Sequence, residues 1–281
     1  MKQPLAEVFG HLITDQSNKA VRYRTKRLCP FPNKVPNCTK DKASDPLGVC
    51  SIFENSSPVI ACPVRFRQNW QIAEDAARFF FAKGTSWTSL TEVRLTDADG
   101  KSAGNIDLVL VSYDCCGKVT GFGAVEVQAV YISGNARRPF QAYMSDPAGM
   151  ASMDWTSERN YPRADYLSSS REMLAKQLLV KRGILHAWGK KTAIAIDRCF
   201  FDTLPDMQEV PEGQADVAWL VYDLVADASR KAQAAGQVKL ALHKVVYSAW
   251  PVLLVAEKIP VPEEIRGFTK RINVMLDDVA V

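Results

Sequence analysis

The chain has 281 residues, enough for one large domain or for one domain with a small additional module. Hydrophobic residues make up 47% of it and charged residues 23%, which is typical of globular proteins. No apolar stretch reaches the roughly 18 residues that a membrane-spanning helix needs, so no such helix is expected. The first sixteen residues lack the regions of a signal peptide, and the sequence therefore predicts a cytoplasmic protein.

The net charge of +4 is unevenly distributed along the chain. Residues 1–70 contain 11 Lys and Arg against 5 Asp and Glu, whereas the remainder contains 24 against 26. The basic part includes Arg22, Arg24, Lys26 and Arg27 in close succession. Such a cluster fits a phosphate-bearing partner, and it fits a solvated surface equally well.

In chain order, the pattern first predicts a short helix over residues 4–13. Residues 29–63 contain six prolines and four cysteines with little apolar periodicity, so this stretch needs a cross-link to stabilise its conformation. A helix follows over residues 70–83 and ends before Gly84. Three strand signals come next, over residues 88–95, 106–113 and 119–132.

After a loop over residues 134–167, Ser169 and Glu172 form a plausible capping box for a helix over residues 170–188. Its inward face is expected to contain Leu174, Leu178, the stem of Lys181, Leu185 and Trp188. Strands are predicted over residues 192–197, 216–224 and 238–249, and a last helix begins at Pro262.

The order from residue 70 is helix, three meandering strands, helix and strand, which predicts an α/β fold with a mixed sheet flanked by helices. This is also the order of the PD-(D/E)xK nuclease core, although many folds share it. The sequence thus divides into residues 1–69, with the N-terminal helix and an irregular four-cysteine metal-binding module, and residues 70–281, the endonuclease core.

Three polar residues interrupt two apolar strands. Glu126 and Gln128 point to the same face because side chains alternate along a strand, and Asp107 can approach Glu126 if the second and third strands pair. Two neighbouring carboxylates repel each other unless a cation lies between them, and Mg²⁺ prefers such oxygen ligands. Taken singly, Asp107 also fits a strand-start turn, and Glu126 fits a buried ion pair with an arginine.

This Asp…Glu-x-Gln pattern resembles the variant of the PD-(D/E)xK motif in which Gln replaces Lys. Since Gln has no charge, a residue elsewhere or the metal ion must stabilise negative charge, and Lys176 on the following helix is one candidate. Glu92, on the preceding strand, is a candidate third acid, or else an exposed strand residue.

Four of the seven cysteines lie within 34 residues, at positions 29, 38, 50 and 62. An odd number of cysteines in a cytosolic chain argues against a disulfide framework. Four thiolates suit zinc or iron, so Cys29, Cys38, Cys50 and Cys62 are predicted ligands of a structural metal, with free buried thiols as the alternative.

Several short segments occur in the following order along the chain: EVFGH, LCPFPN, GVC and ACPVRF, then NIDLVL, GAVEVQ and ADVAWLVYDL. In these segments the chain resembles the NotI-type restriction endonucleases from residue 7 to about 225. The resemblance implies Mg²⁺-dependent cutting of palindromic, GC-rich double-stranded DNA by a homodimer. It implies that Glu92, Asp107, Glu126 and Gln128 form the active site and that the four cysteines hold iron or zinc.

DNA contacts are expected from arginines. Arg137 and Arg138 directly follow the catalytic strand and are the candidates for guanine readout, whereas Arg65 and Arg67 are candidates for phosphate contacts. Plain surface charge is the alternative for all four. Two other functions also fit the sequence: a nuclease of the same core with a repair or less specific role, and an inactive, metal-stapled DNA-binding protein.

Overall fold

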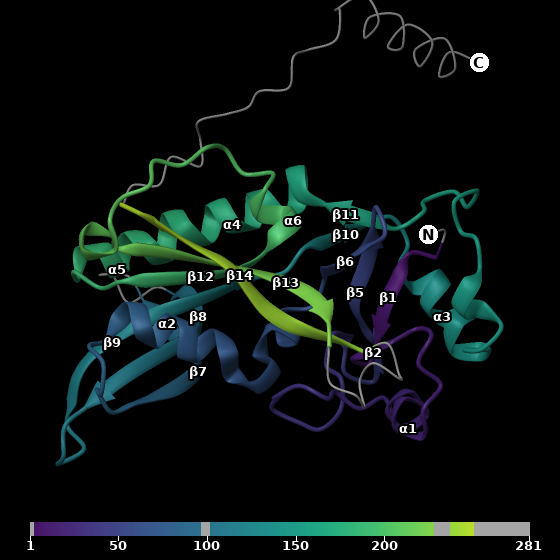
Figure 1. The fold of residues 1–281 in the computed structure, drawn as a ribbon, viewed down its shortest axis with the longest axis horizontal. Helices are drawn as coiled ribbons and strands as arrows, with labels where there is room; N and C mark the ends of the chain where they lie inside the picture. Colours follow the sequence, from purple (N-terminus) through teal and green to yellow (C-terminus); the bar gives the residue numbers. More distant parts are fainter. Residues whose placement is uncertain (1–2, 97–101, 228–236, 250–281) are drawn as a thin grey trace, which may run out of the picture.

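The computed structural model describes residues 3–96, 102–227 and 237–249, so the helix predicted from Pro262 lies outside the described residues. Its centre is a six-stranded mixed sheet in the order β14-β13-β12-β9-β8-β7 (Figure 1). β12 runs parallel to β9 and β13, and the other pairs are antiparallel. The strands are β7 (Trp87–Thr96), β8 (Ser102–Tyr113), β9 (Val119–Gln128), β12 (Thr192–Asp197), β13 (Val217–Ala226) and β14 (Val238–Ser248).

Helices cover both faces of this sheet. On one face, α2 (Gln71–Phe80) packs its Ile72, Ala76 and Phe79 against β8 and β9. On the other, a continuous helical segment packs Leu174 and Leu178 against β12 and β13. This segment comprises η3 (Tyr166–Ser170), α4 (Arg171–Gln177), η4 (Leu178–Arg182) and α5 (Gly183–Ala187). The predicted mixed α/β sheet flanked by helices is confirmed, with its helix, three strands, helix and strand in the expected order.

The start of that helical segment differs from the prediction. Asp165 caps it, because its carboxylate accepts hydrogen bonds from the backbone N–H groups of Ser168 and Ser169, whereas Ser169 itself lies inside the first turn. The segment also contains two π-helical turns, which the apolar periodicity did not indicate. Trp188, expected to face inward, follows α5 and is 52% exposed.

The N-terminal segment forms a second sheet in the order β2-β1-β5-β6, and the helix predicted over residues 4–13 is wrong. Phe9 and Gly10 both have positive φ and make a turn between two short strands, which breaks any helix there. The strands are β1 (Leu5–Val8), β2 (His11–Leu12), β5 (Val49–Glu54) and β6 (Ser57–Ile60). A helix, α1 (Asn18–Lys26), begins later, with the Ser17 hydroxyl as its cap.

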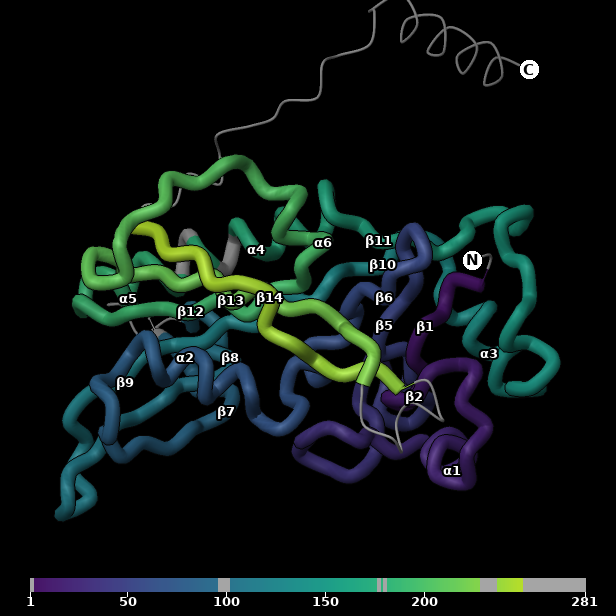
Figure 2. Tube along the Cα trace, viewed as in Figure 1, coloured from purple at the N-terminus to yellow at the C-terminus, as the bar shows by residue number. Residues whose placement is uncertain are grey.

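Smaller elements lie before, between and after these strands. They are β3 (Asp41–Lys42), β4 (Asp45–Pro46), η1 (Pro63–Trp70), β10 (Tyr131–Ser133), α3 (Arg137–Ser145), η2 (Met150–Ser152), β11 (Arg163–Asp165), α6 (Arg198–Phe201) and η5 (Glu212–Gln214). Phe140 and Tyr143 of α3 pack into the apolar core of the N-terminal sheet, beside Leu5 and Val8. The division of the chain after residue 69 stays a prediction. Figure 2 shows the hairpin between β8 and β9 extending beyond the rest of the sheet.

Candidate active site

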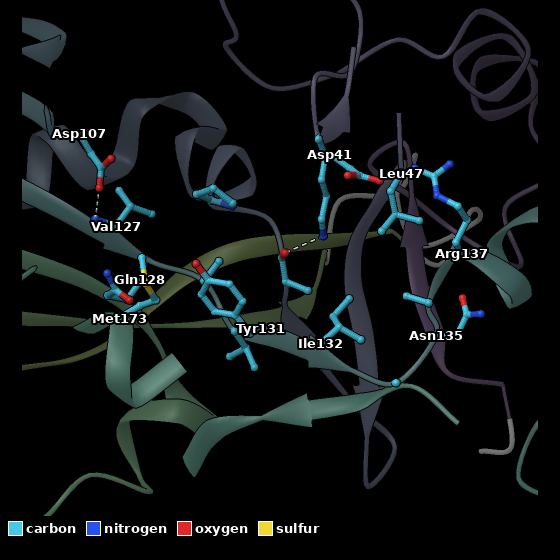
Figure 3. Close-up of a pocket in the computed structure, with 17 residues that line it drawn as sticks. Asp41, Leu47, Asp107, Val127, Gln128, Tyr131, Ile132, Asn135, Arg137 and Met173 are labelled. Carbon is cyan, nitrogen blue, oxygen red and sulfur yellow. Dashed lines mark hydrogen bonds and ion pairs between the residues drawn. The ribbon is translucent and has the colours of Figure 1, made fainter. Parts of the chain in front are cut away.

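Asp107 and Glu126 lie side by side on adjacent strands. Leu108 of β8 pairs with Val125 of β9, and this antiparallel register places Asp107 opposite Glu126 on the same face. The Asp107 carboxylate also accepts a hydrogen bond of 2.8 Å from the backbone N–H of Val127 (Figure 3). Two acids that the sequence predicted to approach each other are therefore held at one place by the strand pairing.

Glu126 is a buried acid whose surroundings disfavour its charged form. Its side chain is 2% exposed, and burial followed by the neighbouring Asp107 raises the pKa of its carboxyl to about 8, although nearby Lys181 acts to lower it. Oxygen Oε2 accepts a hydrogen bond of 2.7 Å from the Lys181 ammonium group. Oxygen Oε1 is buried and has no hydrogen-bond partner among the described residues. A buried carboxylate oxygen of this kind suits a cation.

The cavity beside these acids has a volume of about 640 Å³ and lies between strands β8 and β9 and the N-terminal segment. Asp107 and Gln128 line one end of it, and Arg137 lines the other (Figure 3). Met173 lies beside Gln128, and Tyr131 lies between the two ends. Gln128 therefore borders this cavity, whereas Glu126 is not among the described residues that line it.

Glu92 occupies a different environment from the other two acids. It lies on β7 with a positive φ of 53°, and its carboxylate pairs with Lys34 at 2.5 Å. Within the described part of the chain, no three His, Cys, Asp or Glu side chains form a group that could hold a metal ion as they stand. The structure thus brings Asp107 and Glu126 together without adding Glu92 to them.

A lysine that the sequence did not single out for this role lies beside the acids, and Lys176 stays a prediction. The side chain of Lys176 lies outside the described residues, whereas Lys181 of η4 reaches Glu126 and the Asn105 carbonyl. The signal for Lys181 was present in the sequence, because it is a lysine at an apolar position of an inward-facing helix. Such a residue needs an acceptor for its charge, and only the fold shows which one.

The four clustered cysteines all line one cavity of about 270 Å³. They are free thiols, and burial raises the pKa of the Cys29 thiol to about 11. Lys40 lines both this cavity and the larger one, and its ammonium group donates to the carbonyls of Val49 and Ala61. The donor set suits a thiophilic metal, but the thiols are not yet in a ligating arrangement. Cys115 and Cys116 lie apart from them, exposed on the β8–β9 hairpin.

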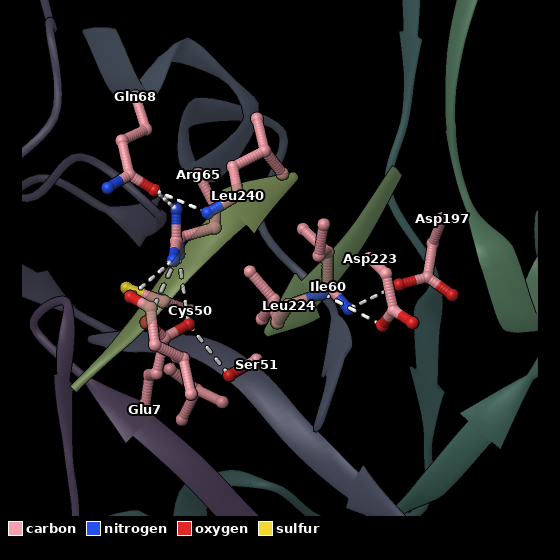
Figure 4. Close-up of polar contacts among 12 residues, drawn as sticks. Glu7, Cys50, Ser51, Ile60, Arg65, Gln68, Asp197, Asp223, Leu224 and Leu240 are labelled. Atoms are coloured by element: carbon pink, nitrogen blue, oxygen red, sulfur yellow. Dashed lines mark hydrogen bonds and ion pairs between the residues drawn. The ribbon is translucent and has the colours of Figure 1, made fainter. Parts of the chain in front are cut away.

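Three of the arginine candidates have protein partners. Arg137, at the start of α3, forms ion pairs with Asp41 and Asp45. Arg138 forms an ion pair with Glu158 at 2.6 Å. Arg65 is 1% exposed and lies inside the molecule rather than on a surface that DNA could reach. Its guanidinium binds the buried carboxylate of Glu7 at 3.0 Å, as Figure 4 shows. Arg67 is half-buried beside the cysteine cavity.

No helix among the described residues is long and apolar enough to cross a membrane. No curated protein matches the chain. The family model described as Restriction endonuclease NotI matches residues 7–237, a range that contains the four cysteines, the paired acids and Lys181 but ends before β14. Because this match covers most of the sequence, the chain belongs to the NotI restriction endonuclease family, which implies a type II restriction endonuclease.

Proposed function

We propose that this protein cuts both strands of a specific DNA sequence by Mg²⁺-dependent hydrolysis, with a PD-(D/E)xK core whose lysine position holds Gln128. The observation that supports this most is the pair of acids on β8 and β9. Asp107 and the buried Glu126 face each other, and Glu126 retains one oxygen without a hydrogen-bond partner among the described residues. Mg²⁺ is commonly held by one or two carboxylates together with water and phosphate oxygens, which fits this pair.

In this proposal each residue has a separate task. Asp107 and Glu126 hold the cation, which when bound polarises a phosphodiester oxygen and lowers the pKa of a water molecule. Gln128 lines the cavity beside Asp107 and orients the attacking water or a phosphate oxygen with its amide group. Val127 fixes the Asp107 carboxylate through its N–H, so that this acid is already oriented when DNA arrives. Glu92 joins the site only if it leaves Lys34.

Membership of the NotI family supports a proposal about which DNA is cut. We propose a palindromic, GC-rich site that is cut in the cytoplasm by a homodimer, because a two-fold symmetric enzyme matches a palindrome and supplies one active site for each strand. Arg138, whose side chain is 61% exposed, is the better placed candidate for reading bases. Arg137 must first release its two aspartates, since both terminal nitrogens of its guanidinium are engaged.

The four cysteines are proposed to hold structural iron or zinc. Their shared cavity and free thiols support this, and metal binding would draw the sulfur atoms together. Four thiolates close a tetrahedral site without an open position, so this metal has no catalytic task. Its proposed role is to hold the loops that lie between the N-terminal sheet and the larger cavity.

The decisive experiment is digestion of unmethylated phage-length DNA with Mg²⁺, beside an EDTA control and the Glu126→Ala variant. The proposal expects discrete fragments that disappear in both controls, and sequencing of their ends gives the site. A smear would instead support a less specific nuclease of the same core. Intact DNA with a mobility shift under all conditions would support the inactive DNA-binding protein and reject cleavage.

A further inference from the structure

We propose that Lys181 is a positioning residue of the nuclease site: its ammonium group holds one oxygen of Glu126, so that the other oxygen is presented to the cation. This inference rests on the proposed function. It assigns to a helical lysine the support that Gln128, being uncharged, cannot give to the paired acids.

Two hydrogen bonds hold the ammonium group of Lys181 in place. Its ammonium group donates to Glu126 Oε2 at 2.7 Å and to the Asn105 carbonyl at 2.6 Å, so β9 and β8 each supply one acceptor. Lys181 is 8% exposed. A buried lysine with two fixed acceptors has little freedom to move, and it therefore sets the rotation of the Glu126 carboxylate.

Gly104 shapes the backbone next to this lysine. Its φ of +99° strongly favours glycine, and it immediately precedes Asn105, whose carbonyl accepts from Lys181. A Cβ atom at Gly104 would lie 3.4 Å from the Lys181 Cε atom, in ordinary van der Waals contact, so the requirement for glycine comes from the backbone conformation.

The location of Lys181 separates positioning from direct catalysis. Asp107 and Gln128 line the cavity of about 640 Å³, whereas Glu126 and Lys181 are not among the described residues that line it. Glu126 is held on the lysine side through Oε2, while Oε1 has no hydrogen-bond partner among the described residues. Because Lys181 is hydrogen-bonded to Glu126 itself, its proposed action on the cation runs through this acid.

The test compares Lys181→Met and Lys181→Arg with Lys191→Met as the matched control. Lys191 is also partly buried and donates to a backbone carbonyl, that of Phe79. Three quantities are measured: Mn²⁺ affinity without DNA by electron paramagnetic resonance, DNA affinity in Ca²⁺, and the single-turnover cleavage rate in Mg²⁺. Circular dichroism checks folding, and Lys181→Gln replaces Lys181→Met if the latter does not fold.

The proposal expects Lys181→Met to lose about 10- to 100-fold in Mn²⁺ affinity and in cleavage rate, with DNA affinity almost unchanged. Lys181→Arg should recover part of both losses, and Lys191→Met should behave as the wild type. Wild-type Mn²⁺ affinity in Lys181→Met would overturn the proposal. If the wild-type protein binds Mn²⁺ but cuts no DNA, the proposed function fails, while the Mn²⁺ affinities still decide the role of Lys181.

Discussion

At the scale of single residues, the paired acids oppose folding. Asp107 and Glu126 are brought together on one face, and burial with the neighbouring acid raises the pKa of Glu126 to about 8. Lys181 compensates one oxygen only. Functional sites commonly hold such unfavourable arrangements at the expense of stability.

In EDTA and above about pH 8, where Glu126 is ionised, Asp107→Asn should therefore be more stable than the wild type, by about 1 kcal/mol in the free energy of unfolding. The amide oxygen can still accept from Val127, while the repulsion of Glu126 is removed. Urea unfolding measures the gain, and DNA digestion should show that cleavage is lost. Asp114→Asn, in the exposed hairpin, should show no gain; a less stable Asp107→Asn protein would mean that the two acids do not oppose each other.

The buried ion pair between Arg65 and Glu7 leads to a second prediction at this scale. Arg65→Met should lower the free energy of unfolding by about 3–5 kcal/mol, because it leaves a buried carboxylate without its partner. Arg67→Met, two residues away and half-buried, should cost less than about 1 kcal/mol. The double variant Glu7→Gln/Arg65→Met should recover part of the loss. Equal urea midpoints for Arg65→Met and Arg67→Met would contradict this account.

At the scale of elements, the strands of the six-stranded sheet could be predicted because they are apolar or rich in β-branched residues and are bounded by turn residues. The N-terminal strands could not, because residues 4–13 are short and their hydrogen-bond partner is β5, over forty residues later. Asp107 and Glu126 were predictable because they lie on adjacent strands of one hairpin. Lys181 was not, because no periodicity tells which strand residue a buried lysine meets.

Asp197, at the end of β12, links the two sheets and predicts a pH dependence. Its carboxylate accepts from the N–H of Ile60 in β6 and from the N–H groups that begin α6 (Figure 4). Burial, with a smaller contribution from Asp223, raises its pKa from 3.8 to about 7. The folded protein therefore holds this proton more tightly than the unfolded chain, and its stabilising contribution is complete below pH 3.8 and lost as the pH rises through 7.

Asp197→Asn should remove this part of the pH dependence, because the amide carries no charge at any pH. The measurement is the free energy of urea unfolding between pH 4 and about 8. Relative to Asp197→Asn, the wild type should lose stability steadily with rising pH in this window. The exposed neighbour Asp202 offers a control, and Asp202→Asn should keep the wild-type slope. A wild-type curve parallel to that of Asp197→Asn would refute the prediction.

At the scale of the whole molecule, ion pairs join the cysteine-bearing segment to β7 of the six-stranded sheet and to α3. Lys34, between Cys29 and Cys38, binds Glu92 of β7. Asp41 and Asp45, between Cys38 and Cys50, bind Arg137 of α3. The conformation of the cysteine loops thus affects both a candidate acid and a candidate DNA-binding residue.

Removal of the proposed structural metal should therefore affect the entire protein. Chelation under reducing conditions is expected to lower the melting temperature by about 5–10 °C, because the cysteine loops lose their staple. Calorimetry measures the shift, and elemental analysis measures the metal content. The Cys115→Ser/Cys116→Ser variant should retain its metal, whereas Cys50→Ser should not. A protein purified without iron or zinc, and indifferent to chelation, would contradict the prediction.

The connection between Lys181 and Glu126 also has a consequence for synthesis on the ribosome. Asp107 and Val127 are 20 residues apart and meet within one hairpin, whereas Lys181 follows Glu126 by 55 residues. At typical translation rates this interval lasts about 3–11 s. A nascent chain thus carries the paired acids well before the lysine that orients them, and the host chromosome meets the complete nuclease only after the helix behind β9 has emerged.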